Sequence, residues 1–192
     1  MLFIVGNVCS QEWISLDQSD CRDAFTAIKL KSDTTEYIVK YTIHGIYDSM
    51  ITNENGEYHQ ISIESIGCLS KIGCPSLPIL TQSIAIPEGA SIAVSVKEEN
   101  WSDISIGQIY PSQEPLFEND ITKEFIQDKE SYRNDFFPQL VQISKEMVWR
   151  GVRNVRVTIC PFKYYPTQNR LSVLSDFTLQ VSFQHGKTPI KE

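Results

Sequence analysis

The sequence predicts an all-β protein: an antiparallel β-sandwich of jelly-roll-like type with one long loop or short helix. Apolar and polar side chains alternate in many short segments, turn-forming residues separate these segments, and almost no segment has helical periodicity. Alternation with a period of two places one face of a strand in a core, and strands at hairpin spacing pair antiparallel. We expect one such domain over residues 11–192.

The alternation recurs along the whole chain. Shorter rows lie at 36–44, 92–96 and 155–159, and Asn55-Gly56 is a dipeptide that tolerates the positive φ angles of tight hairpins. The longest row predicts a strand near the C-terminus with one buried face, made of Leu171, Val173, Ser175, Phe177, Leu179, Val181 and Phe183.

One polar segment, residues 118–133, departs from this pattern. Ile121 and Phe125 stand four residues apart within it, which suits a short helix on a long surface loop.

Composition excludes several classes of protein. The 192 residues are 41% hydrophobic and carry a net charge of −7, and no apolar run reaches the roughly 18 residues that span a membrane. Residues 139–192 hold eight basic and three acidic side chains, so the remainder is strongly acidic; this split can orient a partner protein or simply reflect solvated strand faces. Nucleic-acid binding is not indicated, because no basic patch is interleaved with exposed aromatic side chains.

The first ten residues are uncharged and mostly apolar, with Val8 and Ser10 spaced as signal peptidase requires. We interpret residues 1–10 as the remnant of a secretory signal peptide. A lipoprotein acylated at Cys9 and an ordinary N-terminal strand remain as alternatives.

Export would permit disulfides. Cys68 and Cys74 lie close together in a loop-like stretch, so a Cys68–Cys74 bridge is one alternative, and buried free thiols are the favoured one. A metal site is not indicated, because this pair has no second pair or His cluster nearby.

No catalytic or cofactor-binding motif is present. His44-Gly45 matches the His-Gly of caspase-like proteases, but no cysteine has the sequence context of a nucleophile, and His44 ends an alternating row. The chain also has no phosphate-binding loop and no dinucleotide fingerprint. We therefore expect a binding or scaffolding domain, with no catalytic residues, no cofactor and no metal.

A series of turn and aromatic motifs across about residues 66–183 resembles the propeptide of gingipain-type cysteine proteases. The motifs, in order, are Gly73-x-Pro75-x-Leu77-Pro78, Pro87-x-Gly89, Tyr110-Pro111, Pro115, Tyr132, Phe136-Phe137-Pro138, Arg150-Gly151-Val152-Arg153, Cys160-Pro161-Phe162-Lys163-Tyr164-Tyr165-Pro166 and Leu171-Ser172-Val173.

The resemblance implies an exported domain of a Gram-negative bacterium, located in the periplasm, on the cell surface or outside the cell. Its implied partner is a caspase-like catalytic domain, whose folding it assists and whose active site it blocks. In that family a basic side chain on a surface loop can fill the specificity pocket. The candidates on the polar segment are Lys123, Lys129 and Arg133, with Lys123 and Lys129 ranked first.

Two questions stay open at this point. The chain is either a fragment of a longer precursor or a free-standing relative that acts in trans. The alternative function is a secreted carbohydrate-binding or adhesion module, which would present exposed, coplanar aromatic rings and often a calcium site; Trp101, Trp149, Tyr164 and Tyr165 could supply such rings.

Overall fold

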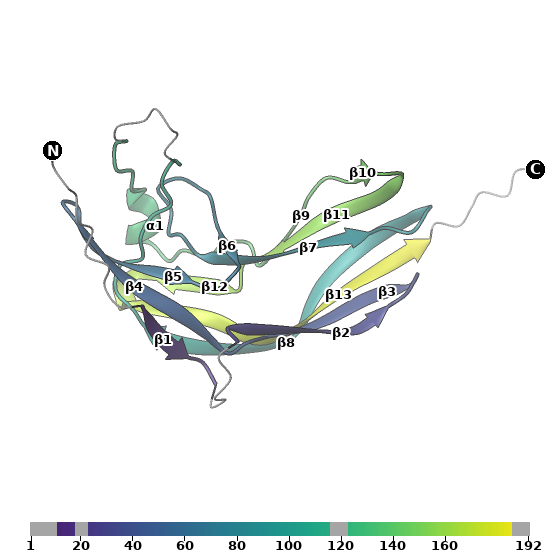
Figure 1. The fold of residues 1–192 in the computed structure, drawn as a ribbon, viewed down its shortest axis with the longest axis horizontal. Coiled ribbons are helices and arrows are strands. Elements are labelled where there is room, and N and C mark those ends of the chain that lie inside the picture. The colour runs from purple at the N-terminus through teal and green to yellow at the C-terminus, as the bar shows by residue number, and fades with distance from the viewer. Residues whose placement is uncertain (1–10, 18–22, 116–122, 186–192) are drawn as a thin grey trace, which may run out of the picture.

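The computed structural model describes residues 11–17, 23–115 and 123–185 (Figure 1). These ranges contain thirteen strands, the single-turn helix α1 (Lys129–Arg133) and the 3-10 turn η1 (Pro166–Gln168). The strands are β1 (Glu12–Ser15), β2 (Phe25–Ser32), β3 (Glu36–Ile43), β4 (Gly45–Asn53), β5 (Gly56–Ser62), β6 (Gly67–Cys68), β7 (Pro78–Ala85), β8 (Ala90–Ser105), β9 (Val141–Ile143), β10 (Met147–Trp149), β11 (Val152–Ile159), β12 (Phe162–Tyr165) and β13 (Arg170–His185).

The strands form three sheets whose strand pairs are antiparallel. The largest sheet has the order β12-β13-β3-β2, and β8 pairs with the other edge of β13. The second has the order β10-β11-β7-β6, with β9 also paired to β11, and the third has the order β1-β4-β5. Figure 1 shows β7 and β11 above β13 and β3, as two layers of a sandwich. The prediction of an all-β antiparallel fold is confirmed.

Strand β13 holds the largest sheet together. Its residues 176–182 pair with β3 on one edge and with β8 on the other, whereas residues 170–173 pair with β12. The pairing with β8 shifts between Leu174 and Asp176, and Ser175 Oγ there donates a hydrogen bond to the Asn100 carbonyl at 3.2 Å. This irregularity is a β-bulge. It adds one residue to the strand, so the side chains beyond it point to the opposite face from the one that regular alternation would give.

Because of the bulge, one strand serves two hydrophobic cores. Leu171 and Val173 pack with buried side chains of β4, β5 and β12. Leu174 and, beyond the bulge, Phe177 pack with buried side chains of β3, β7 and β11. The sequence predicted one continuous buried face for this strand, and that detail was wrong, because Ser175 is the extra residue that changes which face is buried.

Other predicted features agree with the structure. Val155, Val157 and Ile159 of β11 are all fully buried, as their alternation predicted. The segment 118–133 does contain a short helix, α1, but at Lys129–Arg133; Phe125, which suggested a helix, lies in irregular backbone, and Ile121 lies outside the described ranges. Residues 1–10, interpreted as a signal-peptide remnant, also lie outside them. In the part of the chain that is described, no helix has the length and hydrophobicity needed to cross a bilayer.

Replacing Phe177 should strongly destabilise the sandwich. Its side chain is completely buried and stacks on Tyr41 with ring centroids 5.2 Å apart. We expect Phe177→Ala to lower the free energy of unfolding by about 3–5 kcal/mol in urea denaturation, because the truncation leaves a cavity. Leu30→Ala, at a side chain that is 58% exposed, is the control and should change stability little. Equal effects of the two substitutions would contradict this core assignment.

Candidate functional site: the basic loop

The segment that carries the candidate basic residues connects β8 to β9, and we call residues 113–137 the basic loop. Its helix α1 lies at one end of the molecule, and β10 lies at the opposite end (Figure 1). Only one turn of the described part is helical, so the loop's own secondary structure contributes little to its position. The contacts that hold it come from the body of the protein.

The neck of the loop is closed by a side-chain amide. Gln113 Nε2 donates to the Ile126 carbonyl at 2.7 Å, and Gln113 Oε1 accepts from the Ile126 amide at 2.9 Å. The Phe125 ring packs against Tyr58 and Tyr110, with centroids 5.6 and 5.9 Å away. The two hydrogen bonds reproduce the pairing of two strands, and the aromatic contacts fix the neck on the body.

A glycine permits the next contact. The Asp128 amide donates to the Gly73 carbonyl at 2.9 Å, and the Gly73 amide donates to the Ser112 carbonyl at 2.8 Å. Gly73 has a φ of +81°, and a Cβ at this position would lie 3.0 Å from the Asp128 nitrogen. Both the backbone conformation and the close approach therefore require glycine here.

Asp128 organises helix α1. It is the N-cap residue: its Oδ1 accepts from the Glu130 amide at 3.3 Å, and its Oδ2 accepts from Ser131 Oγ at 2.6 Å. The Ser131 hydroxyl is the main reason that the pKa of Asp128 lies below its usual value, and the backbone amides of Glu130 and Ser131 lower it further.

The far end of the basic loop is held by Tyr132 and Phe136. Tyr132 donates its hydroxyl to the Ile109 carbonyl at 2.7 Å, and burial raises the pKa of this hydroxyl. The amides of Phe136 and Tyr164 each donate to the other's carbonyl, at 2.8 and 3.0 Å. Helix α1 is thus fixed to the body on both of its sides.

The three predicted basic residues have different environments. Lys123 Nζ lies 3.3 Å from Glu114 Oε2 and donates to the Pro115 carbonyl at 2.9 Å, so this lysine is bound within the neck. Lys129 and Arg133 are exposed at the two ends of α1. Within the described residues, neither of these two side chains forms an ion pair. The structure brings all three into one loop but leaves only Lys129 and Arg133 available to a partner's carboxylate.

The structure has Cys68, Cys74 and Cys160 as free thiols, so it does not contain the Cys68–Cys74 bridge that was one alternative. Cys74 is buried beneath α1, with its Sγ 3.3 Å from Ser131 Oγ. Cys160 is also buried, which raises the pKa of its thiol to about 12. Cys74 and Cys160 are therefore buried thiols, whereas Cys68 in β6 is only partly buried.

His44 lies at the junction of β3 and β4, as its position at the end of an alternating row predicted. Its Nδ1 is 2.5 Å from Asp17 Oδ2, and its Nε2 is 3.3 Å from Thr26 Oγ1. These contacts join the segment after β1 and strand β2 to the junction. Both ring nitrogens of His44 therefore face oxygen atoms, and the Cys74 thiol lies against Ser131, so these groups do not form a thiol–imidazole pair.

The aromatic residues considered for carbohydrate binding do not form one platform. Tyr164 is buried, Lys163 Nζ covers the Trp101 ring at 3.8 Å, and Tyr165 packs between Phe137 and Arg170. Of these four rings, only that of Trp149 is widely exposed. The described residues also contain no group of three His, Cys, Asp or Glu side chains placed to bind a metal ion.

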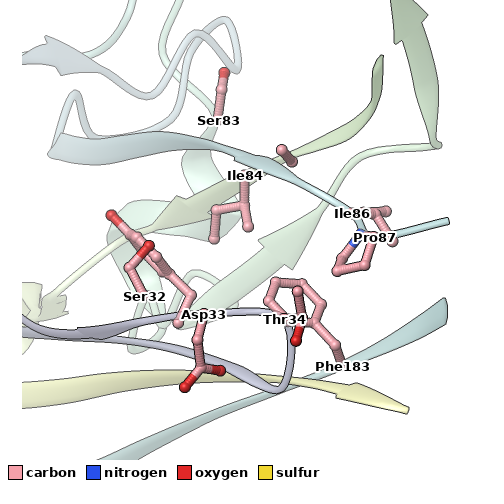
Figure 2. A pocket seen from close by; sticks show the side chains of 10 residues that line it. Ser32, Asp33, Thr34, Ser83, Ile84, Ile86, Pro87 and Phe183 are labelled. Atoms are coloured by element: carbon pink, nitrogen blue, oxygen red, sulfur yellow. The ribbon is translucent and has the colours of Figure 1, made fainter. Parts of the chain in front are cut away.

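A cavity of about 470 Å³ lies between the two layers of the sandwich. Figure 2 shows Ile84 of β7 and Ile86, just after that strand, on one side of it and Thr34 and Phe183 on the other. Its apolar walls continue the core, and none of its lining residues belongs to the basic loop. The cavity is therefore separate from the candidate site.

Replacing Gly73 should release the basic loop without touching a loop residue. We expect Gly73→Ala to accelerate chymotrypsin cleavage at Phe125 roughly tenfold or more, because strain of about 1–3 kcal/mol falls on the contact with Asp128. The matched control is Gly89→Ala. Gly89 also has a positive φ (+69°), but an added Cβ there would meet no atom within 4 Å. Equal acceleration in both variants would contradict the anchoring role of Gly73.

The lowered pKa of Asp128 predicts how α1 responds to acid. Its folded-state pKa lies below the ordinary 3.8, so the cap stabilises α1 above that value and is lost as the pH falls through the lowered pKa. In NMR titrations the amide shifts of Glu130 and Ser131 should change with a midpoint below 3.8, and Asp128→Asn should abolish the change. A midpoint at or above 3.8 would contradict the capping geometry.

Comparison with known proteins identifies the family. The Propeptide_C25 family model matches residues 25–192. Lys-gingipain of Porphyromonas gingivalis is 25% identical over an alignment of 189 positions that covers 94% of this chain but 11% of that protein. Gingipain R1 of the same species is 28% identical over 117 residues, which are 59% of this chain and 12% of that protein. The chain thus spans about a tenth of the length of these relatives.

Two solved structures share the fold. A chain from a study of the zymogenic latency of gingipain K of P. gingivalis superposes with a TM-score of 0.79 at 22% identity, covering 92% of this chain and 100% of that one. A chain from the complex of the P. gingivalis RgpB pro- and mature domains superposes with a TM-score of 0.73 at 20% identity, covering 86% and 88%. The match to the family model over residues 25–192 shows that this chain belongs to the Propeptide_C25 family, the propeptides of gingipain-type cysteine proteases.

Proposed function

We propose that this propeptide domain inhibits a gingipain-type protease reversibly by placing a basic side chain of its basic loop in the protease's specificity pocket. The observation that carries the proposal is the anchoring of α1 on both sides, by Asp128 at one end and by Tyr132 at the other. A loop fixed in this way loses little conformational entropy on binding, so more of its contact energy appears as affinity.

The chemistry of the pocket would make a cation effective. A pocket that accepts lysine or arginine side chains needs an acidic group, and a buried carboxylate is stabilised by a paired cation and strongly destabilised without one. A propeptide cation would satisfy this carboxylate without presenting a cleavable bond in the correct position.

We assign the pocket-filling role to Lys129. Lys123 would first have to break its contacts with Glu114 and the Pro115 carbonyl, which adds a cost to binding. Lys129 is exposed at the first position of α1, next to the N-cap that fixes its backbone. Arg133 follows one turn later at the end of the helix and is the second candidate.

We also propose that the domain assists the folding of its catalytic domain, a caspase-like partner, and acts after export from the cytoplasm of a Gram-negative bacterium. The relatives named above support both statements through their family and organism. A sandwich with two hydrophobic cores of its own can offer a preformed surface on which a partner domain folds.

Inhibition measurements with single variants test this assignment. Against the mature domain of a gingipain-type protease, Lys129→Ala should raise the inhibition constant about a hundredfold or more, because it leaves a buried carboxylate unpaired. Arg133→Ala and Lys123→Ala are the matched controls and should change the constant far less. If the wild-type chain inhibits and each of the three variants inhibits equally well, the basic-loop mechanism is contradicted. If the wild-type chain does not inhibit, the proposed function is contradicted.

A further inference from the structure

A second surface, at the end of the molecule opposite α1, has no role in the proposed inhibition. Every residue from 142 to 152 is exposed, and these residues run from β9 through β10 into the start of β11. We call this segment the apolar hairpin. Its large exposed side chains are Ile143 (45% exposed), Met147 (44%), Val148 (71%), Trp149 (69%) and Val152 (50%).

The apolar hairpin exposes apolar side chains on both faces, although the Glu146–Arg153 ion pair shares the face of Val148. Trp149 lies opposite Val152 in the register of β10 and β11, so these two side chains share one face. Val148 lies opposite Arg153 and therefore points to the other face. A partner that covered one face would leave the other apolar face in water.

A tight turn and several hydrogen bonds fix the backbone of the hairpin. Arg150 and Gly151 form its tight turn with φ angles of +52° and +78°. Arg153 bonds in bidentate fashion to Glu146, at 2.7 and 2.9 Å, and also donates to the carbonyls of Pro87 and Ala90. These contacts hold the backbone from which the exposed side chains project.

Cations surround this apolar tip although the whole chain carries a net charge of −7. Lys145, Arg150 and Arg156 are exposed, and the Arg150 guanidinium lies 5.0 Å from the centre of the Trp149 ring. The acidic side chain of the hairpin, Glu146, is neutralised by Arg153. In the described structure no carboxylate pairs with the three exposed cations.

We propose that the apolar hairpin binds an anionic lipid surface. The membrane interface surrounds an inserted tip, so it can cover both apolar faces at once, and tryptophan side chains favour this interface. Lipid phosphates supply the negative charge that Lys145, Arg150 and Arg156 lack within the protein. Binding through this tip leaves α1 at the far end of the molecule from the lipid (Figure 1).

Strand β2 provides a matched comparison. Its Ile28 and Leu30 are each 58% exposed and also lie beside lysines. Lys31, however, pairs with Glu36 at 2.8 Å and with Asp33 at 3.5 Å. Lys29 is exposed, with its Nζ 6.0 Å from the centre of the Tyr37 ring, and no described carboxylate pairs with it. The strand thus has one unpaired lysine where the hairpin has three unpaired cations, so the proposal predicts that the hairpin, and not this strand, binds the lipid.

Vesicle sedimentation tests the proposal. The whole chain should bind vesicles made of equal parts phosphatidylglycerol and phosphatidylcholine, and it should not bind pure phosphatidylcholine. Val148→Ser with Trp149→Ser should weaken binding about tenfold or more, and Lys145→Gln with Arg156→Gln should weaken it and reduce its salt dependence. Ile28→Ser with Leu30→Ser should have no effect. Circular dichroism and thermal melts would verify that each variant is folded.

Three results would overturn the proposal: no binding to anionic vesicles, equal binding by the hairpin variants, or equal loss in the β2 variant. A further contradicting result is that the hairpin variants bind vesicles normally but lose affinity for the mature protease domain, which would make the hairpin a protein-docking surface. Because inhibition by the basic loop is measured without lipid, failure of one proposal does not imply failure of the other.

Discussion

The architecture depends on the bulge at Ser175 in β13. In a regular strand, alternate side chains point to the same face. Without the bulge, the apolar row of β13 would therefore lie on one face and line one core only. The extra residue turns the faces, and Leu171 and Phe177 consequently pack into different cores. One strand thus joins the sandwich at one end to the β4–β5 region at the other, which gives a single body long enough to separate α1 from β10 (Figure 1).

That body positions the basic loop. A polar loop with one helical turn has too few internal contacts to hold its own conformation. Here the Gln113 amide, the Gly73 backbone and the Tyr132 hydroxyl each bond to a partner across the loop's base. This support fixes the backbone that carries the basic side chains, so the function that we propose depends on these uncharged residues as well as on Lys129 and Asp128.

The sequence predicted the repetitive parts of the structure and missed those that depend on single contacts. Alternation identified β11 because Val155 and Val157 point into one core. It did not reveal the bulge, because Ser175 continues the same spacing and a register shift depends on the partner strand. The polar segment indicated a loop with three basic candidates. Only the structure distinguished them, because it shows Lys123 paired with Glu114. Gly73 precedes a proline-rich turn, which marked it as a turn residue in the sequence. Its contact with Asp128 could not be predicted, because the two residues are far apart in the sequence.

Amide hydrogen exchange of this chain, alone and with the mature domain of a gingipain-type protease, tests the central claim most directly. If the basic loop is the inhibitory surface, added protection should concentrate in residues 123–133, while strands β10 and β11 exchange as they do in the free chain. Protection confined to other segments, or no change at α1 in a complex that forms, would contradict the account.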